Sequence, residues 1–269
     1  MRRVILVGAK GFVGSAFARL LQTRPDVDLI SVTRENFDSL PATHGDVVIE
    51  AAANSKKFLA EENPAGEFNV SVTHCLRSLL KFTGDVRVHI SSVDVYSDLT
   101  SLEATRESAT INLKGISHYG FHKRLAEQLV QHYSGRWLIL RLAGMVGPGI
   151  RKNPVFDILN GLPLRIHPES RYQYMATDDV ARIAWELVEK NLSCDVYNIC
   201  GTGLITIREI GLFAGLKLDL SELSPVAVPR IVEANNQKIQ RLFSVPNTTD
   251  TIRKFISGHA GNADERSAL

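Results

Sequence analysis

A glycine-rich turn near the start of the chain constrains the fold more than any other feature. Val4–Val7 is a short β-branched and apolar run, as in a strand buried on both faces. Glycine then recurs at every third position, at Gly8, Gly11 and Gly14, and Ser15–Gln22 has apolar residues at helical spacing. A strand, a tight glycine turn and an amphipathic helix in this order predict a dinucleotide-phosphate site at the helix N-terminus.

Short apolar strands and helices continue to alternate along the chain. Strands are expected at Val4–Val7, Leu29–Thr33, Asp46–Ala52, Val86–Ile90, Leu138–Leu142 and Val196–Ile199, and helices at Ser15–Gln22, Glu67–Phe82, Tyr119–Tyr133 and Asp178–Glu189. This alternation predicts the α/β class, with a doubly wound parallel (Rossmann) sheet covered by helices on both faces.

Two parts of the chain lack this regularity. Met145–Tyr174 is rich in proline, glycine, arginine and histidine, and the region after Gly201 is broken by prolines. We expect both to form a small lobe over the carboxyl ends of the strands, where such sheets bind ligands. The expected division is a dinucleotide-binding Rossmann domain of residues 1–143 plus 177–200, and a small substrate-binding lobe of residues 144–176 plus 201–269.

Composition argues against several classes of protein. The formal net charge is +2, and pairs such as Lys56-Lys57 are interpreted as solvated surface charge, so no nucleic-acid partner is expected. No apolar stretch approaches the ~20 residues of a membrane span. The three cysteines and eight histidines lack metal-ligand spacing. We therefore expect a cytoplasmic protein without a metal site.

The end of the second strand bears on the choice of dinucleotide. An acidic residue here would bind the ribose 2′-hydroxyl of NAD, but this strand ends in Thr33-Arg34. An arginine can instead pair with the 2′-phosphate of NADP, and Lys10 in the glycine turn adds positive charge. Glu35 follows directly, which leaves NAD possible. The sequence favours NADP.

A serine, a tyrosine and a lysine are the candidate catalytic residues. Tyr119 and Lys123 stand at i and i+4, on one face of the expected helix. Ser91-Ser92 directly follows a buried strand and so lies at its carboxyl end. Tyr-xxx-Lys alone is common by chance, but its order after a strand-end serine and a glycine turn is specific.

With these residues the chain resembles the extended short-chain dehydrogenase/reductase family, also called the NAD-dependent epimerase/dehydratase family. The similar motifs cover nearly the whole chain: GAKGFVG, DVVIEAAA, SSVDVY, YGFHK, RLAGMVGPG, TDDVA and VYNICG. The resemblance implies that Tyr119 is the acid/base and that Lys123 lowers its pKa and holds the nicotinamide ribose. It implies that Ser92 hydrogen-bonds the substrate oxygen, because the family's serine or threonine lies four residues before the aromatic, here Tyr96.

The chemistry explains these residue types, because a free phenol has a pKa of ~10 and a nearby ammonium stabilises the phenolate. Together, the glycine turn and the resemblance predict one set of cofactor-binding residues. They are Gly8, Lys10, Gly11, Phe12, Val13, Gly14, Arg34, Ala51, Ala52, Ala53, Asn69 and Lys123.

The substrate class follows only from the resemblance. Family members commonly act on nucleotide-sugars, as epimerases, dehydratases or keto reductases. The dehydratases carry an Asp-Glu pair after the active threonine, where this chain has Val93-Asp94, and valine cannot donate a proton. GDP-fucose synthases have a similar glycine turn and Thr-Arg strand end, but epimerise through a cysteine where this chain has Asp94.

We therefore expect NADP-dependent reduction of a keto-sugar nucleotide or a similar small substrate. A nucleotide-sugar epimerase is one alternative. A non-catalytic, cofactor-binding regulatory subunit is the other, although a binding module has no need to keep Ser92, Tyr119 and Lys123 together. In the lobe, Arg151, Arg165, His167 and Arg171 could meet a substrate diphosphate or form a basic surface loop.

Assembly is expected to be homodimeric. Family members usually pair two helices from each subunit in a four-helix bundle, here Asn69–Phe82 and Tyr119–Tyr133. The apolar residues available for the seam are Val70, Leu76, Leu80, Leu125, Leu129 and Val130. A monomer, with all of them facing the protein's own sheet, is the alternative.

Overall fold

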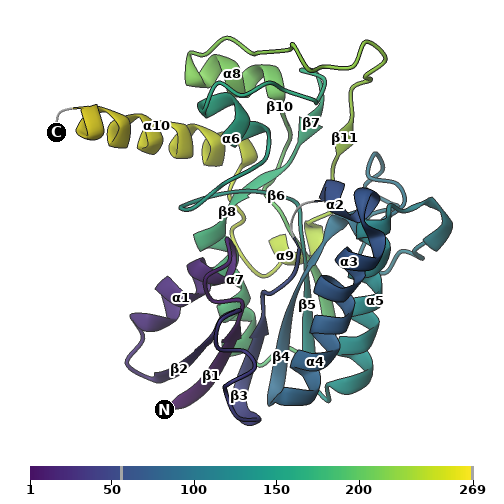
Figure 1. The fold of residues 1–269 in the computed structure, drawn as a ribbon, viewed down its shortest axis with the longest axis vertical. Helices are drawn as coiled ribbons and strands as arrows, with labels where there is room; N and C mark the ends of the chain where they lie inside the picture. Colours follow the sequence, from purple (N-terminus) through teal and green to yellow (C-terminus); the bar gives the residue numbers. More distant parts are fainter. Residues whose placement is uncertain (55–56, 268–269) are drawn as a thin grey trace.

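A parallel sheet organises the chain (Figure 1). The computed structural model describes residues 1–54 and 57–267. Within them the sheet has six strands in the order β2-β1-β3-β4-β5-β9, all parallel. The strands are β1 (Arg2–Val7), β2 (Val27–Val32), β3 (Thr43–Glu50), β4 (Phe82–Ser92), β5 (Trp137–Leu142) and β9 (Asp195–Ile199). Every expected strand is present, which confirms the doubly wound α/β fold.

Helices cover both faces of this sheet. On one face lie α1 (Gly14–Gln22) and α7 (Thr177–Glu189), whose apolar side chains pack with the strands in one large core. On the other face lie α4 (His74–Lys81) and α5 (His118–Tyr133), as Figure 1 shows. These helices form where the sequence has apolar residues at helical spacing, as expected.

The helix expected at Glu67–Phe82 contains an irregular turn. It is built from α3 (Pro64–Phe68), a π-helical turn at Asn69–Thr73, and α4, and it is preceded by α2 (Lys57–Glu62). Such π-turns are frequent at functional sites. This one packs against α5, the helix of the Tyr-xxx-Lys pair.

A smaller lobe stands over the carboxyl ends of the strands (Figure 1). Its elements are β6 (Gly144–Val146), α6 (Pro154–Leu159), β7 (Arg171–Tyr172), β8 (Tyr174–Ala176), β10 (Ile205–Thr206), α8 (Ile207–Ala214), β11 (Ile231–Val232) and α10 (Thr248–Ser267). All of them except β11 contribute to a second apolar core. The region after Gly201 is thus more regular than its prolines suggest, and α8 begins with a Thr206–Glu209 capping box that is legible in the sequence.

One segment grouped with the lobe in the sequence returns to the large sheet. The short helix α9 (Gln237–Gln240) packs against β9, and its Ile239 is fully buried in the large core. Across the described residues, no helix is both long and apolar enough to cross a membrane.

The side chains expected to form the dimer seam differ in their exposure to solvent. Val70 is 48% exposed and Leu80 63% exposed, so both are available to a partner. Val130, by contrast, is completely buried against the protein's own sheet and cannot contribute to a seam.

Candidate functional site

The glycine turn has the shape that a dinucleotide phosphate needs. Gly8 has a φ of +85°, and a Cβ there would lie 2.7 Å from the Ala52 nitrogen. A Cβ on Gly14 would lie 2.0 Å from the Gly8 carbonyl oxygen, so side chains at either place would displace the turn. Helix α1 starts here with no side-chain cap and no acid in its first turn. The positive end of the α1 dipole therefore suits an anion, and the turn fits the expected cofactor.

The other residues expected around the turn lie nearby. Phe12 and Val13 are half-buried, and Val13 packs on the large core just before α1. The Ala51 nitrogen donates to the Val7 carbonyl oxygen at 2.9 Å, which brings the end of β3 beside the turn. Asn69 opens the π-turn, is exposed, and accepts a hydrogen bond from the Thr73 hydroxyl at 3.3 Å.

A basic residue, Arg34, and an acidic residue, Glu35, follow the end of β2. Arg34 is exposed, and its charge helps to lower the pKa of His74 on α4, after the larger effect of burial. A hydrogen bond from Thr33, a backbone hydrogen bond and the Lys10 ammonium lower the pKa of Glu35. The Lys10 Nζ lies 3.4 Å from a Glu35 oxygen. An arginine for a 2′-phosphate and a carboxylate for a ribose hydroxyl are thus both present.

The three candidate catalytic residues meet where β4 ends against α5. The hydroxyl of Ser92, the last residue of β4, donates to an Asp94 oxygen at 2.5 Å. Tyr119 is in the first turn of α5 and is 6% exposed, and Ser92 acts to lower the pKa of its phenol. One turn later the Lys123 Nζ, also buried, donates to the Ile90 carbonyl oxygen at 2.8 Å.

The protein surroundings of Tyr119 raise the pKa of its phenol, and the lowering by Lys123 that the resemblance implies stays a prediction. Burial, the Asp94 carboxylate and the Glu67 carboxylate raise the pKa of Tyr119, and together they outweigh the opposite effect of Ser92. Burial also lowers the pKa of Lys123. The reason is physical: a desolvated phenol needs a close cation to ionise, and the ammonium is held by a backbone carbonyl instead.

A glycine lets α5 approach the turn that follows Ser92. The Ser117 hydroxyl caps α5 by accepting from the Gly120 nitrogen at 3.2 Å. A Cβ on Gly120 would lie only 2.0 Å from the Asp94 carbonyl oxygen. Because residue 120 has no side chain, the turn after Ser92 packs directly on the helix beside Tyr119.

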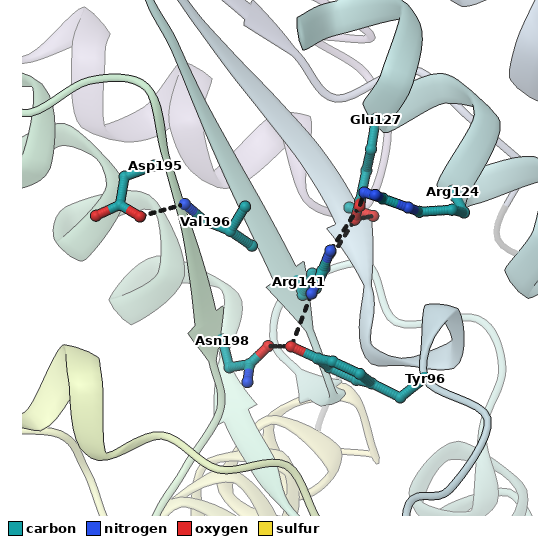
Figure 2. Close-up of polar contacts among 8 residues, drawn as sticks. Tyr96, Arg124, Glu127, Arg141, Asp195, Val196 and Asn198 are labelled. Carbon is teal, nitrogen blue, oxygen red and sulfur yellow. Dashed lines mark hydrogen bonds and ion pairs between the residues drawn. The ribbon is translucent and has the colours of Figure 1, made fainter. Parts of the chain in front are cut away.

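A buried network of ion pairs and hydrogen bonds connects α5 to the central sheet (Figure 2). Glu127 on α5 accepts hydrogen bonds from Arg141 Nε at 2.9 Å and Nη2 at 2.8 Å, and from the Ser91 hydroxyl at 2.6 Å. Arg141 Nη1 donates to the Tyr96 hydroxyl at 2.8 Å, and that hydroxyl donates to Asn198 Oδ1 at 2.9 Å. The network joins α5 to β4, β5, β9 and the turn that follows Ser92.

Sequence reasoning missed one residue beside Asp94 and Tyr119. Lys57, interpreted as surface charge, places its Nζ 2.6 Å from an Asp94 oxygen and 5.9 Å from the centre of the Tyr119 ring. Lys56, the other member of that pair, lies outside the described residues. The missed signal was position: Lys57 follows shortly after the carboxyl end of β3, at the same edge of the sheet as Ser92.

The histidine next to Lys123 contacts a buried carboxylate. His122 is buried, its Nδ1 contacts Glu67, and Ser71 donates to the other oxygen of that carboxylate. The described part of the chain contains no group of three or more His, Cys, Asp or Glu side chains that could hold a metal ion.

In the lobe, the basic residues are spread out. Arg165 is exposed and pairs with Glu222 at 2.6 Å, and Arg171 is exposed on β7. Burial raises the pKa of the neighbouring Tyr172, and the charge of Asp94 adds a smaller effect in the same direction.

Comparisons with known proteins agree with this geometry. RMD from Pseudomonas aeruginosa, solved with NADPH, superposes with a TM-score of 0.78 at 20% identity, over 96% of this chain and 98% of that one. A dTDP-4-dehydrorhamnose reductase from Bacillus anthracis, solved with NADP, gives 0.76 at 17% identity, over 96% and 98%. A UDP-glucuronic acid 4-epimerase from Bacillus cereus, solved with NAD, gives 0.78 at 18% identity, over 95% and 98%.

At these identities the likeness to solved structures establishes the fold alone. A search of curated proteins finds no match. The model of the NAD dependent epimerase/dehydratase family, however, matches residues 4–200, most of the chain. The chain therefore belongs to the NAD dependent epimerase/dehydratase family.

Proposed function

We propose that this protein is an NADP-dependent oxidoreductase that reduces a keto group of a nucleotide-linked sugar or a similar small substrate. The observation that carries the proposal is the meeting of Ser92 and Tyr119 at the carboxyl end of β4, with Lys123 one turn along α5. Two hydroxyl groups there can bind one substrate oxygen, and the phenol can give it a proton. When bound, the nicotinamide supplies the hydride.

The cofactor would lie along the glycine turn of residues 8–14. The N–H groups at the start of α1 would take the pyrophosphate, and Lys123 would hold the nicotinamide ribose. Arg34 supports NADP over NAD because its guanidinium, exposed beyond β2, is free to pair with a 2′-phosphate in a bidentate way. The small lobe, which stands over the carboxyl ends of the strands (Figure 1), would bind the substrate.

Nucleotide-sugar epimerisation is the second candidate. It is favoured by Glu35, whose carboxylate could accept from the ribose hydroxyls of an NAD that stays bound through the reaction. Dehydration has less support, because Val93 is 2% exposed and stands where an acid would be needed.

One experiment separates these candidates. Purified protein is incubated with NADPH or NADH and a panel of 4-keto sugar nucleotides that includes dTDP-4-dehydrorhamnose, and NADPH oxidation is followed by absorbance. Reduction predicts NADPH consumption that Tyr119→Phe abolishes while NADPH binding is kept. Sugar interconversion without added cofactor would favour the epimerase, and cofactor binding with neither reaction would favour a regulatory subunit.

A further inference from the structure

The two hydroxyl groups of the proposed active site come from different elements of the fold. Ser92 ends β4 and leads into a 3₁₀ turn at Val93–Val95, whereas Tyr119 lies in the first turn of α5. A shift of about 1 Å between such groups can slow a reaction by about a hundred-fold. The elements that carry the two hydroxyl groups therefore need a common support.

One buried hydroxyl group, that of Tyr96, connects these elements (Figure 2). Tyr96 directly follows the 3₁₀ turn, and its backbone N–H donates to the Val93 carbonyl oxygen at 3.0 Å. Its hydroxyl accepts from Arg141 Nη1 at 2.8 Å and donates to Asn198 Oδ1 at 2.9 Å. Arg141 in turn forms the bidentate ion pair with Glu127 of α5. One oxygen atom thus links the turn after Ser92 to the helix of Tyr119.

Both hydrogen bonds of this hydroxyl group have a fixed direction. A guanidinium only donates, so the Tyr96 oxygen has to accept from Arg141. The amide nitrogen of Asn198 donates to two backbone carbonyl oxygens, that of Thr105 at 2.7 Å and that of Asn235 at 2.8 Å. Because a carbonyl oxygen only accepts, the amide oxygen of Asn198 has to face Tyr96, and the phenol has to donate to it. These contacts hold the hydroxyl group in one orientation.

The connection continues from Asn198 to the small lobe. Asn235 lies three residues after β11, which pairs with β7 in the sheet of the lobe. The Asn235 backbone N–H donates to the Thr105 hydroxyl at 2.9 Å, and Thr105 is completely buried. The segment that follows Tyr96 and the segment that follows β11 are therefore bound to each other and to β9.

We propose that Tyr96 is a positioning residue whose hydroxyl group holds three parts of the active site in register. These parts are the turn that follows Ser92, the helix that carries Tyr119, and the small lobe. The proposal rests on the reductase function given above. Tyr96 takes no part in the chemistry itself. It acts through the Arg141–Glu127 pair on α5, so that the two reacting hydroxyl groups are aligned before the substrate binds.

Tyr96→Phe tests this role, because it removes the oxygen that makes both hydrogen bonds and keeps the ring in its apolar cluster. The variant is loaded with NADPH and mixed with the keto-sugar nucleotide that the wild type reduces, and a single turnover is followed by stopped-flow absorbance. The rate constant of hydride transfer should fall by about ten-fold or more, at full amplitude. The Kd of NADPH, measured by titration, should stay within about two-fold of wild type. A merely structural role would lower the amplitude, which counts folded enzyme, and leave the rate constant unchanged.

Tyr197→Phe is the matched control. It removes a phenol oxygen from the neighbouring residue of β9, whose buried side chain packs in the large core on the opposite face of the sheet. Its rate constant should equal that of the wild type. Asn198→Leu breaks the connection from the side of the lobe and should also slow hydride transfer, and it provides the test if Tyr96→Phe does not fold.

Three results would overturn the positioning role alone: a wild-type rate constant in either folded variant, a loss of amplitude only, or an equal fall in Tyr197→Phe. A wild-type protein that binds NADPH but reduces no keto-sugar would overturn the proposed function as well.

Discussion

Removing the Glu127 carboxylate should destabilise the protein strongly. Glu127 is completely buried and Arg141 is 2% exposed, and the two form a bidentate pair at 2.8 and 2.9 Å. In Glu127→Gln the amide NH₂ would face guanidinium donors, and the Arg141 charge would stay buried without a counter-ion. Breaking such a pair costs about 3–5 kcal/mol, and in a chain of this size the Tm should fall by about 10 °C.

The assay is urea denaturation followed by circular dichroism, for the wild type, Glu127→Gln, Arg141→Met and the double variant. Because the second substitution removes the charge that the first leaves unpaired, the double variant should lose at least about 2 kcal/mol less than the sum of the single losses. Glu186→Gln, which breaks the surface Arg182–Glu186 pair, is the control and should cost under about 0.5 kcal/mol. A loss below about 1 kcal/mol in Glu127→Gln, or additive losses, would refute the reasoning.

Three other outcomes are expected. Arg34→Ala should weaken NADPH binding by about 2 kcal/mol and NADH binding much less; equal losses by titration calorimetry would show that Arg34 does not bind the 2′-phosphate. Burial raises the pKa of Glu50 to about 7. The free energy of unfolding should therefore fall by about 3 kcal/mol as the pH rises from below 4.5 to above 7. Glu50→Gln should remove this pH dependence in urea melts. The protein should be a dimer by light scattering and Leu80→Glu should weaken it, whereas a wild-type mass near 29.7 kDa would refute the dimer.

The parts of the molecule that depend on local chemistry were predictable from the sequence. The six strands are β-branched and apolar runs, and the glycine turn requires residues without a Cβ at Gly8 and Gly14. That a serine ends β4, and that Tyr119 and Lys123 lie one turn apart on α5, was predictable from the strand and helix patterns. The lobe was harder, because β7 pairs with β10 and β11, which lie more than thirty residues away along the chain and are two residues long each. Such short pairings depend on tertiary packing, which no local pattern records.

The buried charges were missed because a charged residue in a sequence is ordinarily assigned to the surface. Arg141 was the available signal. It stands among leucines on β5, which pairs with β4 on one side and with β9 on the other. A charge there has to find a partner inside the protein. The partner, Glu127, lies four residues beyond Lys123, in what reads as the polar side of a helix.

The two faces of the central sheet pack against their helices through different kinds of side chain, and this difference affects how firmly α5 is held. The α1 and α7 face is a continuous apolar core. The α4 and α5 face contains buried polar side chains from the strands: Glu50, Arg87, His89, Ser91 and Arg141. Apolar packing tolerates small shifts of a helix, whereas a bidentate ion pair at 2.8 Å does not. Since α5 carries Tyr119 and Lys123 above this face, its buried ion pair fixes where the phenol stands relative to Ser92.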